Sequence, residues 1–341
     1  RHSLIDLNRA GVPLLEIVSE PDLRSGEEVD AFMTAMRQLA RWLGISDGNM
    51  QEGSMRCDVN VSVRKKGDTR LGERCEIKNV NSMKFARQAI GYEVKRQIDL
   101  LESGREVTRE TLNFNPATGV TTPMRDKESA HDYRYFPDPD LPPVVLTKRW
   151  VDEVKAQLPP LPKELFEKFV NEFQLPEYDA TLLTSEKETA FFFLDLAKKT
   201  PHLKAAANLI INKINPWLSE TGTALEEFPV SFDHLAQFIQ LIEGGQVSAS
   251  TAYQRLFGEI VEKPGIPPLE LAKSLNLIQT SDTDFLEKIV DEVLAANPDK
   301  VAEYRKGKKG LIGFFMGEVM KASKGKAEPK MTNALILKKL A

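Results

Sequence analysis

The chain has 341 residues, more than one hydrophobic core usually organises, so two or three domains are expected. Its apolar fraction of 41%, charged fraction of 28% and formal net charge of −4 are ordinary for a globular protein and exclude neither an enzyme nor a scaffold. Cys57 and Cys75 are the only cysteines, which argues against a zinc knuckle or a disulfide framework and favours a cytoplasmic location. No apolar run approaches the roughly 18 residues of a membrane span. The start lacks an initiator Met and does not resemble a signal peptide, so we expect a fragment whose N-terminal part is missing.

Strand and helix patterns are interleaved over residues 1–158, which predicts an α+β domain. The first helix begins at a capping box formed by Ser25 and Glu28 and stops at Gly44. A second helix begins at Asn81 or Ser82 and ends at Gly104. Alternation of apolar and polar residues predicts strands at PLLEIVSE (13–20), RCDVNVSV (56–63) and ERCEIKNV (73–80).

Strand patterns end at a proline-rich boundary near residue 159, and the rest of the chain reads as helical. A second break, KPGIPP, separates two all-α parts. The sequence therefore predicts domains at 1–158, 159–264 and 265–341.

The last part concentrates positive charge. Residues 305–341 contain ten Lys or Arg against Glu318 and Glu328. Such an excess suits contact with phosphate. A solvated helical surface explains the same charge equally well.

Two carboxylates lie in the first predicted strand. Glu16 and Glu20 are four residues apart, about 13 Å along a strand, too far to hold one ion together. Glu16 has apolar neighbours on both sides and is the better candidate for a buried carboxylate, which needs a cation or a basic partner. Glu20 would then have a separate task.

The other two predicted strands carry polar residues at alternate positions. Arg56, Asp58 and Asn60 share one face of the first, and Glu76 and Lys78 share one face of the second. Asp and Asn are poor strand formers, so a functional reason is plausible. Acids and bases on adjacent strands would suit Mg²⁺ and a polyphosphate. The alternative is an antiparallel sheet with one solvated face.

Two further residues lie in loop-like segments. Glu52 stands beside a glycine just before a predicted strand, where a solvated turn acid is the simpler interpretation. Arg134 lies in a segment rich in aromatic and proline residues. This segment would either stack on a base or ribose, or pack as an ordered loop over the sheet. Walker, GxGxxG, nucleophile-elbow and HExxH motifs are absent, so an ATP site would be of a less common type.

The same residues carry a family resemblance. The blocks LNRAGVPLLEIVSEPD, EGSMRCDVNVSV, EIKNVNS, DYRYFPDPD and GFFMGEVMKASKGKA resemble the GatB family, which forms one of the subunits of the bacterial aspartyl/glutamyl-tRNA amidotransferases. The resemblance extends over essentially the whole chain.

It implies a glutamine-synthetase-like cradle with a kinase site, a helical domain, and a YqeY-like tail that binds tRNA. It implies that ATP phosphorylates the side-chain carboxylate of Glu-tRNA(Gln) or Asp-tRNA(Asn), and that ammonia then forms the amide. A glutaminase A subunit would supply the ammonia, and a small C subunit would complete the complex. The alternative is a non-catalytic tRNA-binding or assembly module.

The resemblance also assigns residues. Glu16 matches the Mg²⁺ ligand of the family's motif. Arg56, Asp58, Asn60 and Lys78 match other parts of the motifs and would be catalytic. From the residue pattern, Glu20 would be a further catalytic position, and Glu52, Glu76 and Arg134 would bind the nucleotide. Because the family begins upstream of Arg1, we expect the chain to be inactive alone.

Overall fold

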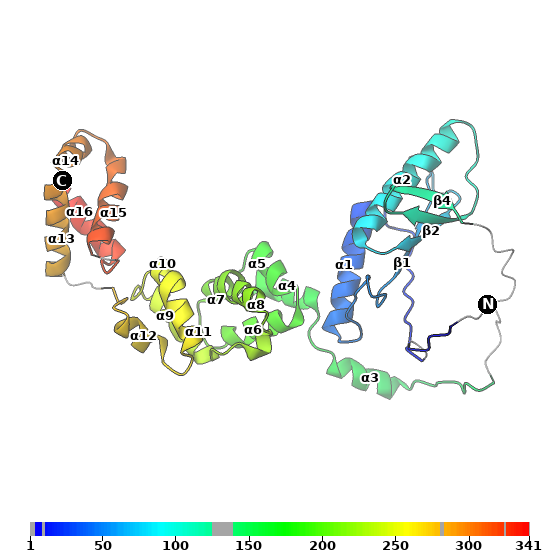
Figure 1. Cartoon of the computed structure of the whole chain (residues 1–341), viewed down its shortest axis with the longest axis horizontal. Helices are drawn as coiled ribbons and strands as arrows, with labels where there is room; N and C mark the ends of the chain where they lie inside the picture. Colours follow the sequence, from blue (N-terminus) through cyan, green and yellow to red (C-terminus); the bar gives the residue numbers. More distant parts are fainter. Residues whose placement is uncertain (1–3, 9–10, 125–138, 280–282, 324, 341) are drawn as a thin grey trace. The chain divides into compact units, whose positions relative to one another are not determined.

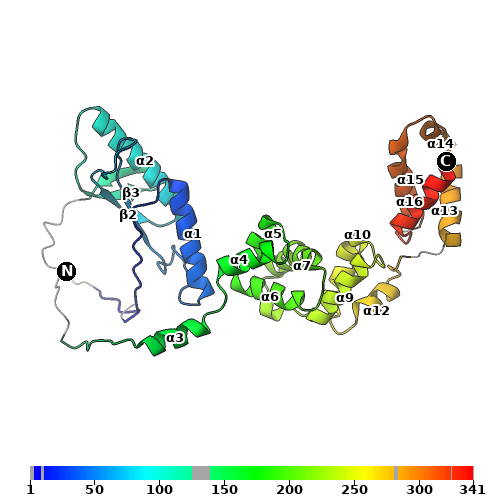
Figure 2. The ribbon, with the colours of Figure 1, turned by 180° about the vertical axis from the view of Figure 1, so that it is seen from behind.

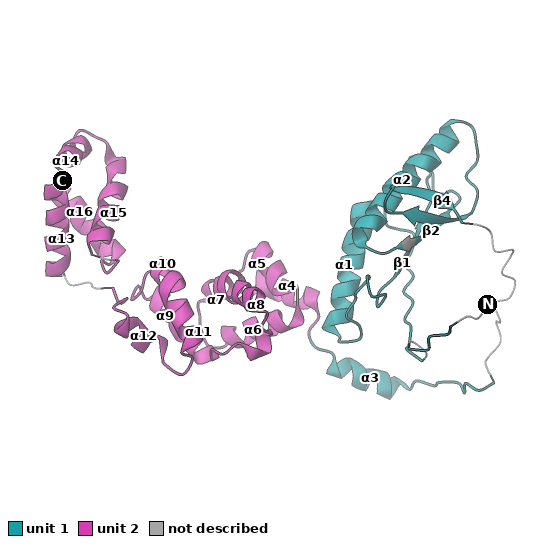
Figure 3. Ribbon diagram, in the orientation of Figure 1, with its two compact units in different colours: residues 1–159 teal, residues 160–341 magenta. Residues whose placement is uncertain are grey.

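The computed structural model describes residues 4–8, 11–124, 139–279, 283–323 and 325–340. The chain divides into two compact units, residues 1–159 and residues 160–341 (Figure 3). The further boundary expected between residues 264 and 265 stays a prediction. Among the described residues, no helix is long and apolar enough to cross a membrane.

The first unit contains a four-stranded mixed sheet. Its spatial order is β1-β2-β3-β4, with β1/β2 and β3/β4 antiparallel and β2/β3 parallel. Figure 2 shows β2 and β3 beside each other. The strands are β1 (Cys57–Val61), β2 (Cys75–Val80), β3 (Thr111–Asn115) and β4 (Val120–Pro123).

One face of the sheet is covered by helix α2 (Met83–Glu102), which also connects the parallel strands β2 and β3 (Figure 1). Helix α1 (Gly26–Trp42) packs against α2. Alternate strand residues, including Val59, Val61 and Ile77, are buried in the core that these elements share. The alternation of β1 and β2 therefore sets an apolar face against α2 and leaves a polar face opposite it.

The helix boundaries follow their capping residues. Ser25 Oγ accepts a hydrogen bond from the backbone N–H of Glu28 at 3.1 Å, and Gly44 has a positive φ of 69° just beyond α1. The carboxylate of Glu28 accepts from the backbone N–H of Arg24, so the reciprocal bond reaches one residue farther back than in the usual capping box. Of the two caps predicted for α2, Ser82 is the one that accepts, from Phe85 N–H at 3.1 Å.

The strand predicted at 13–20 is wrong. Residues 12–20 have no regular secondary structure and are exposed, with Leu14 at 90% and Val18 at 82%. An alternating pattern gives a strand only where a neighbouring strand accepts its backbone hydrogen bonds. This segment pairs with none of the four strands.

Helix α3 (Lys148–Gln157) closes the first unit and was not predicted. It is capped by Thr147, whose Oγ1 accepts from Trp150 N–H at 3.2 Å. None of its residues is buried.

The described residues of the second unit form helices and no strands, as the sequence predicts beyond residue 159. Two π-helical turns, η1 (Ile210–Ile214) and η3 (Ala252–Leu256), interrupt longer helices. The helices up to residue 274 are α4 (Pro162–Asn171), α5 (Glu177–Leu183), α6 (Lys187–Ala197), α7 (Leu203–Leu209), α8 (Asn215–Thr221), the 3-10 turn η2 (Leu225–Glu227), α9 (Phe232–Glu243), α10 (Ala249–Thr251), α11 (Phe257–Glu262) and α12 (Pro268–Ser274).

Helix α12 follows the KPGIPP break but packs with the helices before it. The backbone N–H of Leu269 donates to Gln237 Oε1 of α9 at 3.2 Å. A separate apolar core, centred on Leu286, Phe315 and Ile336, joins the last helices. These are α13 (Thr283–Ala296), α14 (Pro298–Arg305), the 3-10 turn η4 (Lys309–Leu311), α15 (Ile312–Ala322) and α16 (Pro329–Leu340).

Candidate functional site

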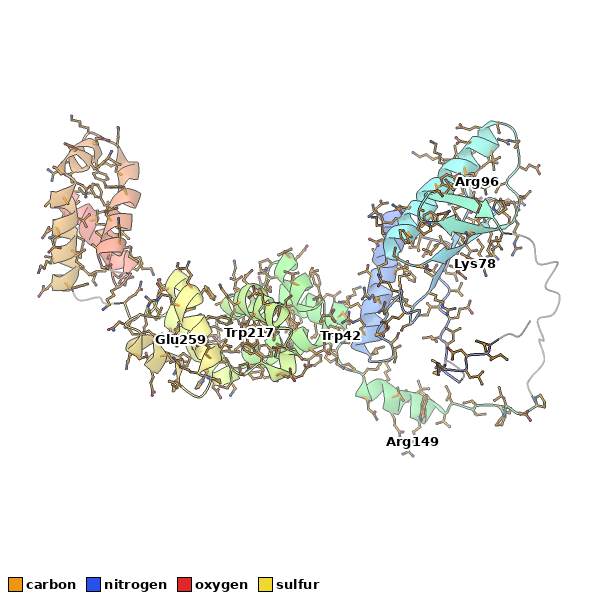
Figure 4. The ribbon with its side chains drawn as sticks, viewed as in Figure 1. Trp42, Lys78, Arg96, Arg149, Trp217 and Glu259 are labelled. Atoms are coloured by element: carbon orange, nitrogen blue, oxygen red, sulfur yellow. The ribbon has the colours of Figure 1, made fainter. Side chains whose placement is uncertain are left out.

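The face of the sheet opposite α2 carries a group of polar side chains, which we call the polar sheet face: Asp58, Asn60, Glu76 and Lys78. Asn60 lies directly opposite Glu76 in the antiparallel β1/β2 pair. Lys78 Nζ is 3.5 Å from Glu76 Oε1, and Thr111 Oγ1 donates to Glu76 Oε2 at 3.4 Å. Figure 4 labels Lys78 on this sheet. The strands thus bring a carboxylate, an ammonium and an amide together.

This face is open to solvent. The side chains of Lys78 and Glu76 are 43% and 36% exposed, and Asp58 and Asn60 are exposed. The register of the β1/β2 pair shifts between Cys57 and Val59, so the pairing is irregular beside Asp58. The polar sheet face is therefore free to bind a charged ligand, because α2 packs on the other side.

Other predicted site residues lie elsewhere or are not described. Glu16 and Glu20 are exposed in the irregular segment before α1 and belong to none of the four paired strands. Arg56 directly precedes β1 and is exposed, and Glu52 lies in a turn between α1 and β1. Arg134 falls outside the described residues.

The donor types on the polar sheet face fit Mg²⁺, although they form no complete cage. Among the described residues, no three His, Cys, Asp or Glu side chains gather closely enough to hold a metal ion. Mg²⁺ commonly uses only one or two carboxylates and completes its shell with water and phosphate oxygens. Oxygen donors such as Glu76 and Asp58 therefore match its chemistry in kind.

The opposite face of the sheet holds a buried ionic network that the sequence analysis missed. Glu93 of α2 is fully buried and accepts hydrogen bonds from Arg96 Nη2 at 2.8 Å, Gln97 Nε2 at 2.8 Å and Thr121 Oγ1 at 3.0 Å. Arg96, labelled in Figure 4, also donates to Glu110 Oε1 at 2.9 Å. The network joins α2 to β4 and to the residue before β3.

A second bond extends the network to β1, because Gln97 Nε2 also donates to the carbonyl of Val61 at 3.1 Å. Burial raises the pKa of the Glu93 carboxyl, but the hydrogen bonds from Arg96, Gln97 and Thr121 outweigh that effect and leave the pKa below its ordinary value. A sequence signal existed: Glu93 and Gln97 continue the buried stripe of α2 that begins at Ala86 and Ala89.

The two cysteines are unreactive in character. Burial raises the pKa of both Cys57 and Cys75 to about 11. Both therefore stay protonated at neutral pH, and neither suits a nucleophile or a metal ligand.

In the second unit, the basic tail frames a groove of about 670 Å³. Leu294 and Val301 line it together with three cations, Arg305, Lys306 and Lys339. Lys339 is already paired with Asp291 at 2.6 Å, whereas Arg305 and Lys306 are exposed. The tail charge is thus partly neutralised within the chain and partly open to an anion.

Comparisons with known proteins identify the family of the chain. Residues 1–152 match the family of the GatB/GatE catalytic domain, and residues 191–340 match the family of the GatB domain. The chain is 49% identical over 337 residues to the B subunit of an aspartyl/glutamyl-tRNA(Asn/Gln) amidotransferase from Trichlorobacter lovleyi, covering 99% of this chain and 70% of that protein.

Proteins of the same name from Geotalea daltonii and Paramagnetospirillum magneticum are both 48% identical over 338 residues. These matches cover 99% of this chain and 70% and 69% of the two relatives. The resemblance seen in the sequence blocks is confirmed. The chain belongs to the GatB family, the B subunit of the amidotransferase ligases that convert misacylated Asp-tRNA(Asn) and Glu-tRNA(Gln) by transamidation.

Proposed function

We propose that the polar sheet face is part of the site where ATP activates the side-chain carboxylate of Glu-tRNA(Gln) or Asp-tRNA(Asn). The observation that supports this is the pairing of Asn60 with Glu76 across β1 and β2, beside the Lys78 ammonium 3.5 Å from Glu76. These groups are not used for packing. The surrounding unit would be the glutamine-synthetase-like cradle that the sequence implies.

In the proposed reaction, a carboxylate oxygen of the aminoacyl side chain attacks the γ-phosphorus of ATP and ADP leaves. Ammonia then attacks the acyl carbon, and phosphate departs as the amide forms. Lys78 would bind phosphate oxygens, and Glu76 would hold the ammonium group of Lys78 in place. Asn60 would orient the substrate through its amide.

Mg²⁺ would offset the phosphate charge when bound. Its proposed protein ligands are Glu16 and the carboxylates of the polar sheet face. Arg56 and Glu20 would assist the chemistry, and Glu52 and Arg134 would contact the nucleotide.

The proposal extends to partners and location. A glutaminase A subunit would deliver the ammonia, a small C subunit would complete a heterotrimer, and the complex would work in the cytoplasm. These assignments follow the resemblance of the sequence.

ADP release by an assembled amidotransferase complex tests the kinase site. Lys78→Ala should lower the rate by about 10²-fold or more, because it removes a charge that stabilises the transferring phosphate. Lys66→Ala, which removes an exposed lysine of the same unit, is the matched control. Unchanged ADP release in Lys78→Ala would refute the proposal. Glu16→Ala should raise the Mg²⁺ concentration needed for half-maximal rate.

The tail supports a second proposed role, tRNA binding. The specific observation is the groove with exposed Arg305 and Lys306 at its rim. Replacing both by Ala should weaken tRNA binding and lower the slope of log affinity against log salt by about 2, since two phosphate contacts are lost. An unchanged salt slope would contradict this role.

A further inference from the structure

A second groove, of about 520 Å³, lies among the helices before the tail. We call it the helical groove. Its lining includes side chains from three helical elements, α7, α9 and η3, from the residue that caps α7, and from the residue that follows α4 and its cap: Phe173, His202, Lys204, Asn208, Glu243 and Tyr253. It is of the size usual for small-molecule sites.

The two aromatic rings of the groove lining each have a lysine ammonium group close by. Lys168 Nζ lies 5.6 Å from the centre of the Phe173 ring, and Lys213 Nζ lies 5.8 Å from the centre of the Tyr253 ring. Each ring therefore has an ammonium group at its side. A ligand with a flat ring and a negative charge would meet both kinds of contact at once.

Several polar groups of the groove are unused within the described part of the chain. Lys204 and Asn208 make no side-chain hydrogen bond or ion pair there, and neither does the Tyr253 hydroxyl. Burial and the nearby Glu243 raise the pKa of the Tyr253 phenol, so it remains a hydrogen-bond donor at neutral pH. These groups are available to a ligand.

The helical groove also lies beside two π-helical turns of the backbone. Tyr253 belongs to the π-helical turn η3, and Lys213 belongs to the π-helical turn η1. Single π-helical turns cost regular hydrogen bonding and often occur at functional sites. Here two such turns bring Lys213 and Tyr253 beside each other.

We propose that the helical groove binds one unstacked nucleotide of the tRNA, with its base against Tyr253. Lys204 and Lys213 would bind the adjoining phosphates. Asn208 and Glu243 would offer an amide and a carboxylate to the edge of the base, which is how proteins read single-stranded RNA. The inference rests on the tRNA substrate of the family and is independent of the ATP site.

Other ligand classes fit less well. An apolar molecule would leave the unused Lys204, Asn208 and Tyr253 hydroxyl without partners, at a free-energy cost. A free phosphate would make no use of the two rings. The aromatic rings together with the unused polar and cationic groups favour a nucleotide.

Binding of a 5′-labelled tRNA transcript to the full chain, measured by fluorescence anisotropy over a range of salt, tests the proposal. Tyr253→Ala should lower affinity by about 5- to 150-fold, the loss of one stacked base, with an unchanged salt slope. Lys204→Ala should instead lower the salt slope by about 1. Tyr253→Phe retains the ring and should bind within about twofold of the wild type.

Two exposed residues of the same helical region serve as matched controls. Tyr178 is 73% exposed and the Lys163 side chain is 87% exposed, and both lie outside the groove lining. Tyr178→Ala and Lys163→Ala should leave affinity within about twofold. Wild-type affinity in Tyr253→Ala, or an equal loss in Tyr178→Ala, would overturn the proposal.

Asn208→Ala covers the case in which Tyr253→Ala does not fold. Asn208 is half-buried and makes no side-chain hydrogen bond within the described residues, so its removal should leave the fold intact. We expect an affinity loss of about 2- to 10-fold from the missing hydrogen bond. No loss in a folded Asn208→Ala would refute the base-edge contact. ADP release reports the kinase site separately, so either proposal can fail without the other.

Discussion

Glu93 offers the sharpest test of how the first unit is held together. Replacing it by Ala removes the acceptor for Arg96, Gln97 and Thr121. Breaking a buried ion pair from one side typically costs about 3–5 kcal/mol, because the remaining charge is left without its partner.

The structure points to the lower end of that range. The Arg96 side chain is 25% exposed and keeps Glu110 at 2.9 Å, so its charge is not orphaned. Gln97 keeps the carbonyl of Val61 at 3.1 Å. We therefore expect Glu93→Ala to lower the free energy of unfolding of the first unit by about 3 kcal/mol.

Urea unfolding followed by tryptophan fluorescence measures this loss. Trp42 is 1% exposed in the first unit, and Trp150 and Trp217 would be replaced by Phe so that Trp42 alone reports. The control is Asp152→Ala, which breaks an exposed pair with Lys148 and should cost less than about 1 kcal/mol. A Glu93→Ala loss no larger than that of the control would refute the reasoning.

Three further predictions concern the same unit. The pKa of Glu93 is lowered in the folded state, so its contribution to stability should be complete well above its ordinary pKa of 4.5 and disappear as the pH falls through the folded value. Glu93→Gln should therefore flatten the acid side of the curve of unfolding free energy against pH. Parallel curves for the wild type and Glu93→Gln would contradict this. Gly91→Ala should raise the free energy of unfolding by up to about 1 kcal/mol, since its added Cβ meets open space at this position of α2. Gly72→Ala should lower it by about 1–3 kcal/mol, because its added Cβ would collide with the backbone oxygen of Val63. Thermal melts that reverse this order would contradict the close packing of Gly72 against Val63. Cys75, with a pKa raised to about 11, should have about 100-fold less thiolate at pH 8 than a thiol of pKa 9.0, so a disulfide reagent should modify it quickly only after unfolding.

Local signals in the sequence were enough to define several elements. Ser25 and Ser82 begin helices because their side chains accept nearby backbone N–H groups, and the glycines beyond both helices adopt positive φ. The alternation of β1 and β2 separates Val59 and Ile77 from Asn60 and Glu76 without reference to distant residues. The long sequence blocks were sufficient to identify the family.

Tertiary structure, in contrast, decided which of the alternating segments pair with another strand. PLLEIVSE alternates as well as β1 does, yet it pairs with none of the strands that the structure describes and stays irregular, because a strand is completed by hydrogen bonds from elsewhere in the chain. The pairing of Asn60 with Glu76 depends on strand register, which composition does not reveal. The sequence does not distinguish Glu93 from other acidic residues of helices, because its burial beside Arg96 and Thr121 depends on how α2 packs on the sheet. The buried network, the polar sheet face and the helical groove all join residues far apart in the sequence, so they exist only once the chain has folded.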